Sequence, residues 1–167
     1  HLHSHTEYSL LDGSNKVRAY AERVKELGMN AAAITDHGNM YGVIEFYLAC
    51  QDAGIKPIIG CEVYVAPGSR FDREIGDHSD RYYHLILLAE NETGYQNLSK
   101  IVSRSFTEGY YYKPRVDKEL LREFHEGIIC SSACLAGEVA RDLVRGDKEA
   151  AEKAALEYQD IFGKGNF

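Results

Sequence analysis

The residues best suited to chemistry stand at the start of the chain, where histidines alternate with other residues. His1, His3 and His5 occupy every second position of the segment HLHSH. In an extended segment, side chains two positions apart share a face. The spacing therefore predicts that these imidazoles project together, as the ligands of a metal ion must.

Further candidate ligands follow at the ends of apolar runs. Asp36 and His37 come directly after the run AAAIT, and Glu62 stands within the next run, PIIGCEVYV. In a parallel α/β barrel such strand ends converge on the C-terminal face, where active sites lie. Imidazole and carboxylate ligands together suit Zn, Mn or Fe. A single buried histidine is more often a core residue than a ligand, but three coincident positions favour a metal site.

The spacing of apolar residues predicts the elements that position these side chains. A helix is expected from Val17 to Leu27, with Asn15 as its cap and Gly28 as its end. Further strands are expected at 31–35, 57–65, 84–89 and 127–132, further helices at 41–53, 93–106, 118–124, 136–144 and 148–161, and an aromatic and basic loop at 109–117. Strands that alternate with helices indicate an α/β protein with a largely parallel sheet, either doubly wound or closed into a barrel.

The number of strands bears on the choice between these two folds. No G-x-G-x-x-G or Walker loop is present, which disfavours a nucleotide-binding fold. A (β/α) barrel typically takes about 250 residues. This chain has 167, and only five strands are expected in it, the histidine segment included. We therefore expect a barrel that is truncated at its C-terminus.

Composition and charge exclude several classes of protein. The chain has 167 residues, 44% of them hydrophobic and 27% charged, with 19 Lys and Arg against 26 Asp and Glu and a net charge of −7. This is the profile of one globular domain rather than a disordered or fibrous chain. No apolar run is long enough to span a bilayer and no signal peptide is evident, so a cytoplasmic protein without a membrane partner is expected. The acidic balance excludes nucleic-acid binding through bulk charge.

The cysteines also indicate a reducing compartment. Cys50, Cys61, Cys130 and Cys134 have no regular framework spacing, which favours free thiols. Cys130 and Cys134 are four residues apart, and no second pair of similar spacing accompanies them. A zinc finger is therefore disfavoured.

Five longer segments resemble the successive motifs of a known family. They are HLHSHTEYSLLDG, AITDHGNMYG, PIIGCEVYVA, HLILLAENETGYQNL and SSACLAGEV. They resemble the PHP (polymerase and histidinol phosphatase) domain, and more narrowly its version at the N-terminus of bacterial replicative DNA polymerase III alpha subunits of DnaE type. The resemblance runs from His1 to the end of the chain. It implies a distorted (β/α)7 PHP barrel, of which residues 1–167 would be the N-terminal part.

The resemblance also implies a metal centre at the mouth of the barrel. Two to three divalent ions are implied, Zn, Mn or Fe, with Mg as a further candidate. The implied metal ligands are His3, His5, Asp12, His37, Glu62, His84 and Cys134, and a catalytic metal-bound hydroxide would be held by His3, His5, His37 and Glu62. The family's last motif, an Asp-x-His pair, and its last strands are absent from these residues.

Several of these positions have a second reading from the residues alone. Asp12 is also a typical turn residue before a glycine, and Cys134 competes with Cys130, since a reduced cysteine is commonly a small core residue. Asp36 is expected to act behind the ligands by orienting an imidazole or a water. His1 stands where many family members have Asp, so its role stays open. His78 and His125 are assigned no role.

A cluster of divalent ions can activate water and hold both oxygens of a phosphodiester bond that breaks. The resemblance implies a 3′–5′ exonuclease that acts on DNA primer ends, within a polymerase whose nucleotidyl transfer belongs to later domains. The alternative is a catalytically silent module that stabilises the polymerase and docks a separate proofreading exonuclease and other replisome subunits. A free-standing phosphatase for small phosphomonoesters is disfavoured by the long polymerase-type motifs.

Basic and aromatic residues are interleaved in the loops around the expected site. Arg81, Lys113 and Arg115 lie close in sequence to tyrosines at 82–83 and 110–112. Such a combination can follow a single strand of DNA and stack on its bases. The alternative is that these are solvated loop charges and tyrosines at the edge of the core.

Overall fold

The structure is a computed structural model that describes residues 1–73 and 81–167, so His78 lies outside the described residues. β1, β2, β3 and β5 form a sheet in that order, and β4 pairs with β2 outside this path. The elements in chain order are α1 (Val17–Glu26), β1 (Ala31–Ile34), α2 (Val43–Ala53), β2 (Lys56–Val65), β3 (Tyr83–Ala89), α3 (Glu92–Thr107), β4 (Arg115–Val116), α4 (Lys118–Glu123), β5 (Ile128–Ser131), α5 (Glu138–Val144) and α6 (Lys148–Phe162).

The sheet is mixed, because one strand is reversed. β2 is parallel to β1 and β4, but β3 is antiparallel to both β2 and β5. A parallel neighbour needs a long crossover that usually contains a helix. The described parts of the β2–β3 connection, residues 66–73 and 81–82, contain no helix. The expectation of a largely parallel sheet is therefore wrong for β3.

The N-terminal histidine segment is extended, but it is not a strand of the sheet. It lies beside β1, because the Ala33 N–H donates to the His1 carbonyl at 3.2 Å and the Thr35 N–H donates to the Ser4 carbonyl at 2.9 Å. The structure instead has a short strand, β4, within the loop expected at 109–117. Two residues are too few for a period-two pattern, so the sequence does not reveal this strand.

Capping residues explain where several helices begin. The side chains of Asn91, Asp117 and Asp147 accept a backbone N–H at the starts of α3, α4 and α6. The expected cap of α1 is wrong, because its N-cap is Lys16, whose side chain makes no capping hydrogen bond. The Asn15 amide donates instead to the His5 carbonyl at 2.8 Å, which ties the histidine segment to the start of the helix. No helix in the described ranges has the length and apolar character needed to cross a bilayer.

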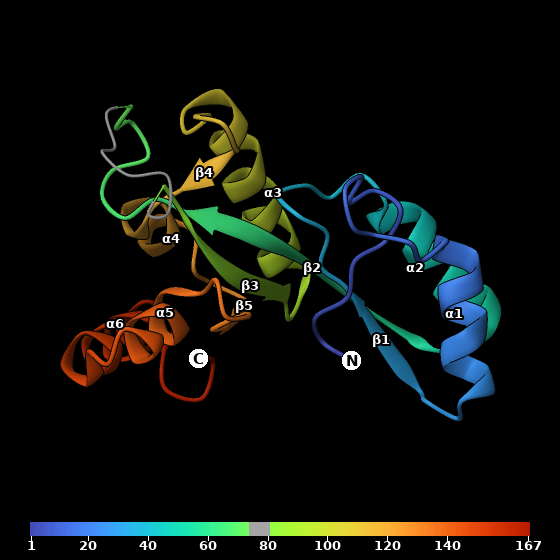
Figure 1. Ribbon diagram of the computed structural model, residues 1–167. Coiled ribbons are helices and arrows are strands. Elements are labelled where there is room, and N and C mark those ends of the chain that lie inside the picture. Colours follow the sequence, from blue (N-terminus) through green and yellow to red (C-terminus); the bar gives the residue numbers. More distant parts are fainter. Residues whose placement is uncertain (74–80) are drawn as a thin grey trace.

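β2 joins two regions of the hydrophobic core (Figure 1). Beside its first half, α1, α2 and β1 pack around Val17, Ile34 and Phe46. Beside its second half, α3, α4 and α6 pack around Val63, Leu87 and residues of the helices. The two groups of helices lie on opposite sides of the view in Figure 1. Because the second half of β2 is buried, residues near its C-terminal end have a fixed position.

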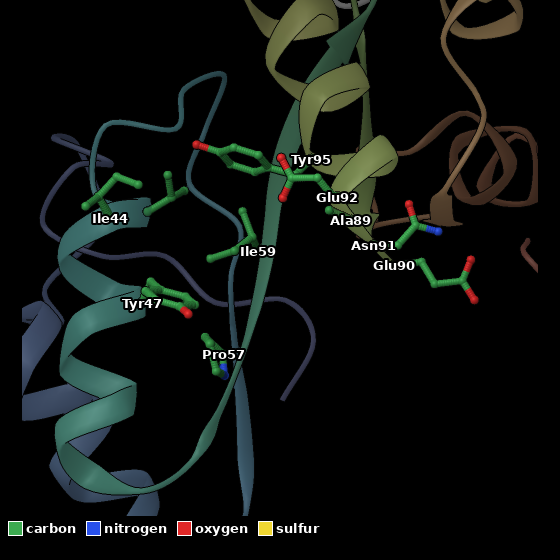
Figure 2. Close-up of a pocket in the computed structure, with 10 residues that line it drawn as sticks. Ile44, Tyr47, Pro57, Ile59, Ala89, Glu90, Asn91, Glu92 and Tyr95 are labelled. Atoms are coloured by element: carbon green, nitrogen blue, oxygen red, sulfur yellow. The ribbon is translucent and has the colours of Figure 1, made fainter.

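A hollow of about 350 Å³ lies between α2 and the start of α3 (Figure 2). Ile44 and Tyr47 of α2, Pro57 and Ile59 of β2, and Tyr95 of α3 contribute to its lining. Pro57 and Ile59, near the start of β2, are only partly buried there. None of the ligands expected from the sequence lines this hollow.

A close backbone approach outside the site joins α3 to the turn before β5. A Cβ at Gly94 would lie 1.8 Å from the carbonyl oxygen of Gly127. We expect Gly94→Ala to lower the free energy of unfolding, measured with urea, by at least about 1–3 kcal/mol, as overpacking does. Thr93→Ala at the exposed neighbouring position should change it by no more than about 0.5 kcal/mol. Equal losses in the two variants would contradict the packing argument.

Candidate metal centre

One carboxylate, that of Glu62, lies among four imidazoles. The Glu62 side chain is 1% exposed, and its Oε1 lies 3.1 Å from His3 Nε2 and 3.0 Å from His84 Nδ1. Its Oε2 lies 3.4 Å from His5 Nε2 and 2.5 Å from His37 Nδ1. The structure thus brings together five of the seven ligands expected from the sequence.

Adjacent parallel segments explain why three of these histidines meet Glu62. His37 follows β1 and forms a parallel bridge with Glu62 of β2. The Glu62 N–H donates to the Asp36 carbonyl at 3.1 Å, and the Gly38 N–H donates to the Glu62 carbonyl at 2.8 Å. The segment that carries His3 and His5 lies beside β1 and ends at the same level. The converging strand ends expected from the sequence are therefore present on this side.

His84 reaches the centre because β3 is reversed. On the antiparallel pair, Glu62 is opposite Ile86 and Tyr64 is opposite His84. Residues two apart on a strand share a face, so Glu62 and His84 are diagonal neighbours on one face. The start of β3 therefore lies beside the C-terminal end of β2. This direction explains how a histidine at the beginning of an apolar run can join ligands at the ends of others.

Asp12 and Cys134 lie at the edge of this cluster. Asp12 Oδ2 is 3.0 Å from His37 Nε2, and the Asp12 side chain is 58% exposed. Cys134 Sγ is 3.6 Å from His84 Nδ1 and 4.0 Å from Glu62 Oε1. Cys130, the competing cysteine, is buried in the core. Of the two thiols, the structure places Cys134 at the centre.

Asp36 does not contact an imidazole through its carboxylate, which differs from the expected role. The buried Asp36 carboxylate accepts hydrogen bonds from the Thr6 N–H, the Thr6 hydroxyl and the Ser9 hydroxyl, at 2.6, 2.7 and 2.7 Å. No described contact lets this carboxylate orient an imidazole directly, and the orientation of a water by Asp36 stays a prediction. The carboxylate points toward the loop after His5 because that loop offers three donors.

The remaining described histidines lie outside the ligand groups. His1 is exposed, and its backbone carbonyl accepts a hydrogen bond from the Ala33 N–H. His125 is exposed near the end of α4, where its Nδ1 lies 2.8 Å from the Arg122 carbonyl oxygen. Neither belongs to a cluster that could hold an ion within the described ranges.

Arg115, expected at a DNA-binding surface, is fully buried. Its guanidinium donates to the carbonyl oxygens of Gly109, Arg70 and Asp72, at 3.2, 3.2 and 2.6 Å. These bonds join two loops that are far apart in sequence. The expectation of a DNA contact is therefore wrong for Arg115, because its side chain is enclosed by backbone acceptors.

Arg81 and Lys113 are placed differently, since both are partly exposed. Lys113 Nζ lies 5.4 Å from the ring centroid of Tyr64, which is in turn 5.3 Å from the ring of His84. The Arg81 guanidinium lies over the ring of Tyr112 at 4.0 Å. Lys113 is therefore a close cationic neighbour of the histidine cluster, and DNA binding by both residues stays a prediction.

The pKa shifts at the centre favour an ionised carboxylate. Burial favours neutral Glu62, but contacts with His3, His37 and His84 outweigh it and hold the pKa of Glu62 far below its usual range. Contact with Glu62 raises the pKa of His37. Burial, followed by the charge of His37, lowers the pKa of His5. Neighbouring imidazoles therefore differ in how readily they take up a proton.

The donor set fits divalent metal ions. His5 Nδ1 is buried and has no hydrogen-bond partner among the described residues, and the buried His37 Nδ1 and Glu62 Oε2 face each other at 2.5 Å without hydrogen-bond geometry, whereas buried polar atoms nearly always have a partner. Two groups, His3–His5–Glu62 and His37–Glu62–His84, each offer three ligand atoms within 4.8 Å of one another. Imidazole nitrogens and carboxylate oxygens are ligands of Zn, Mn and Fe. Both groups contain Glu62, so its carboxylate would be a ligand in either group.

Two residues near the centre, Tyr64 and Ser9, were assigned no role from the sequence alone. The Tyr64 ring stacks at 6.3 Å from His37 and meets Tyr82 edge-on at 4.9 Å. Burial, and then the charge of Tyr82, raises the pKa of Tyr64, so this hydroxyl stays protonated. Tyr64 lies two residues after Glu62, so the period-two rule places both on one face and could have indicated it. No comparable signal marks Ser9, which lies in a loop.

Comparison of the chain with known proteins agrees with the family resemblance of its five motifs. The sequence profile described as the PHP domain matches residues 1–167. The chain belongs to the PHP domain family. The expected α/β class, with the distorted barrel type of this family, is therefore confirmed, and β3 is the reversed strand of its mixed sheet.

The PHP domain is similar over nearly its whole length to much longer proteins. It is 53% identical to DNA polymerase III subunit alpha of Treponema pallidum (strain Nichols) over 100% of the chain and 14% of the relative. The same subunit of Chlamydia pneumoniae is 48% identical over 96% of the chain and 13% of the relative. For Helicobacter pylori (strain ATCC 700392 / 26695) the values are 49%, 97% and 14%. The chain thus spans about one seventh of the length of these relatives.

Two solved structures are also similar to the PHP domain. One, from Bifidobacterium adolescentis, is named as a candidate metal-dependent phosphoesterase and has a TM-score of 0.44 at 22% identity over 63% of this chain and 32% of that one. The other is an amidohydrolase from Chromobacterium violaceum, with a TM-score of 0.40 at 22% identity over 63% of this chain and 35% of that one.

Proposed function

We propose that this PHP domain is the N-terminal part of a DNA polymerase III alpha polypeptide and that its centre hydrolyses phosphodiester bonds. Identity of 46–53% to curated alpha subunits over almost the whole chain supports the first part. The chain spans only about 14% of the first of these relatives. In this proposal, the last strands of the domain and its Asp-x-His motif belong to the polypeptide that follows residue 167.

The observation that carries the second part is the shared carboxylate of Glu62 among four histidines. We infer that the centre holds two to three divalent ions, Zn, Mn or Fe, with Mg as a further candidate. The proposed ligands are His3, His5, Asp12, His37, Glu62, His84 and Cys134. When bound, such ions lower the pKa of a coordinated water and neutralise charge on a phosphate.

The residues of the chain would divide the remaining work by their positions. Glu62 is almost fully buried and ionised, so it offsets the positive charge gathered at the centre. Asp12 is largely exposed, so its carboxylate is open to a substrate that arrives from solvent, and contact with His37 lowers its pKa and so favours the ionised form. The Tyr64 ring covers His37 and His84 and limits the access of water from that side.

The proposed substrate is the 3′ end of a DNA primer. Lys113 lies beside Tyr64 at the edge of the centre, where a cation can contact a phosphate. Arg81 over Tyr112 adds a second cation next to an exposed ring. Cations and rings that alternate along a surface are typical of single-strand binding.

A 5′-labelled primer incubated with the complete polypeptide tests this proposal. With Mn²⁺ or Zn²⁺ we expect products that shorten from the 3′ end, and a primer with a 3′-terminal phosphorothioate should resist digestion. Chelator should abolish the reaction. Complete resistance of the primer, with no effect of chelator on protein stability, would contradict a nuclease and favour the silent module that docks a separate exonuclease.

A second prediction concerns acid. Protons compete with metal at every ligating imidazole, and His37 has a raised pKa whereas His5 has a lowered one. As pH falls, His37 protonates before His5, so the His37–Glu62–His84 group should lose metal at a higher pH than the His3–His5–Glu62 group. Bound metal stabilises the fold according to the ratio of free metal to its dissociation constant.

Melting curves with and without chelator measure this effect. We expect chelator to lower the melting temperature near neutral pH and to have little effect at about pH 5.5, below the usual histidine pKa of about 6.5. Metal content after dialysis should fall in two steps between these values. An equal effect of chelator at both pH values would count against histidine ligands.

A further inference from the structure

The loop from Thr6 to Gly13 carries Asp12, and Ser9 holds this loop closed. The Ser9 carbonyl accepts the N–H groups of Asp12 and Gly13, at 3.1 and 2.8 Å, and the Ser9 N–H donates to the Thr6 carbonyl at 2.8 Å. The closure is tight, because a Cβ at Gly13 would lie 1.8 Å from the Thr6 carbonyl oxygen. These backbone hydrogen bonds of Ser9 therefore fix the position of the Asp12 backbone.

The side chain of Ser9 fixes the same loop to the end of β1. Ser9 is 3% exposed. Its hydroxyl donates to Asp36 Oδ1 at 2.7 Å and accepts the N–H of His37 at 3.0 Å. Asp36 is itself 1% exposed, and both of its oxygens also bind Thr6. One hydroxyl group thus connects the loop of Asp12 to the backbone of His37.

Other contacts do little to hold the Asp12 carboxylate. Its side chain is 58% exposed and, within the described part of the chain, its carboxylate contacts His37 Nε2. A side chain in this setting takes its position from its backbone. The loop is mostly polar or exposed around Asp12, since Leu10 and Leu11 are 90% and 92% exposed and add no packing.

We propose that Ser9 is a positioning residue that holds Asp12 and His37 in the relative placement needed for both to bind one ion. This inference deepens the proposed function and rests on it. Asp36 then acts through Ser9 and Thr6, which explains why a buried carboxylate next to His37 faces away from the imidazoles. Ser9 itself is not a ligand, because its hydroxyl is already used by Asp36 and His37.

Titration of the complete polypeptide with Zn²⁺ against a competing chromophoric chelator tests the coupling. We expect Ser9→Ala and Asp12→Asn each to weaken one class of Zn²⁺ site by about 10–100-fold, the range for loss of a supporting partner. The Zn²⁺ affinity of the double variant should be no more than about twofold below that of whichever single variant binds Zn²⁺ more weakly, because the effects of interacting residues are not additive. Fully additive losses would overturn the proposal.

A matched serine controls for the loss of a buried hydroxyl. Ser105 is 2% exposed and donates to the Val102 carbonyl at 2.6 Å within α3, away from the centre. Ser105→Ala should leave Zn²⁺ affinity unchanged even if it lowers the melting temperature as much as Ser9→Ala does. Equal Zn²⁺ affinities in Ser9→Ala and Ser105→Ala would overturn the positioning role.

A second measurement is independent of metal. Amide hydrogen exchange of the chelator-treated protein should be at least about tenfold faster for Asp12, Gly13 and His37 in Ser9→Ala than in the unmodified protein, because fewer hydrogen bonds close the loop. Unchanged exchange at these amides would overturn the proposal. Failure of the unmodified protein to bind Zn²⁺ would instead overturn the proposed function, so the two failures are distinguishable.

Discussion

Glu62→Gln should abolish metal binding by this PHP domain and, with it, any hydrolysis of DNA. Glu62 contacts four histidines and belongs to both ligand groups, so one substitution affects both. Glutamine keeps the size of the side chain but removes its charge. Loss of a partner behind a ligand weakens metal binding by about 10–100-fold, and loss of the shared ligand should exceed this range. Elemental analysis and primer digestion measure the two effects.

Glu119→Gln is the matched control for this substitution. Glu119 lies in α4 with an 82% exposed side chain, and its ion pair with Arg70 is long, at 3.9 Å. Its replacement should change neither metal content nor digestion. Glu62→Gln protein that retains its full metal content would show that the histidines form a hydrogen-bonded cluster rather than a metal centre.

Asp117→Ala should be the most destabilising change away from the centre. Asp117 and Arg70 side chains are each 4% exposed, and Arg70 Nη1 donates to both carboxylate oxygens, at 2.9 and 3.0 Å. Asp117 also accepts the backbone N–H groups of Arg70 and Leu120, at 2.8 and 2.9 Å. Removal of one partner from a buried pair typically costs about 3–5 kcal/mol, because the other charge stays buried. Arg70 keeps an ion pair with Glu108 at 2.7 Å, so we expect the lower end of this range. Urea unfolding should show a loss of this size.

Asp147→Ala is a control for the capping role of Asp117, because it removes a helix cap without removing the buried ion pair. Asp147 caps α6 by accepting the Ala150 N–H at 2.9 Å, at an exposed site. Its loss should cost about 1 kcal/mol, as for an ordinary cap. If Asp117→Ala costs no more than Asp147→Ala, Asp117 acts as a cap alone and the buried pair adds nothing.

Residue types and short-range spacing were enough to predict much of this PHP domain. The helices at 43–53, 92–107 and 148–162 follow from apolar periodicity and from capping residues, which act within a few positions. The alternation of His3 and His5, and the placement of His37 and Glu62 in or after apolar runs, predicted side chains that the structure brings together. These properties are local, so the order of residues along the chain determines them.

The tertiary structure decided which segments became neighbours. The direction of β3 depends on the connection after β2, and this direction alone brings His84 beside Glu62. Arg115 looked like a surface cation, yet the fold surrounds its guanidinium with backbone carbonyls. Asp36 is adjacent to His37 in sequence, but its carboxylate binds Thr6 and Ser9, some 30 and 27 residues away. Hydrogen-bond partners of buried polar groups are chosen from whatever the folded chain brings within reach, and no short-range pattern encodes that choice.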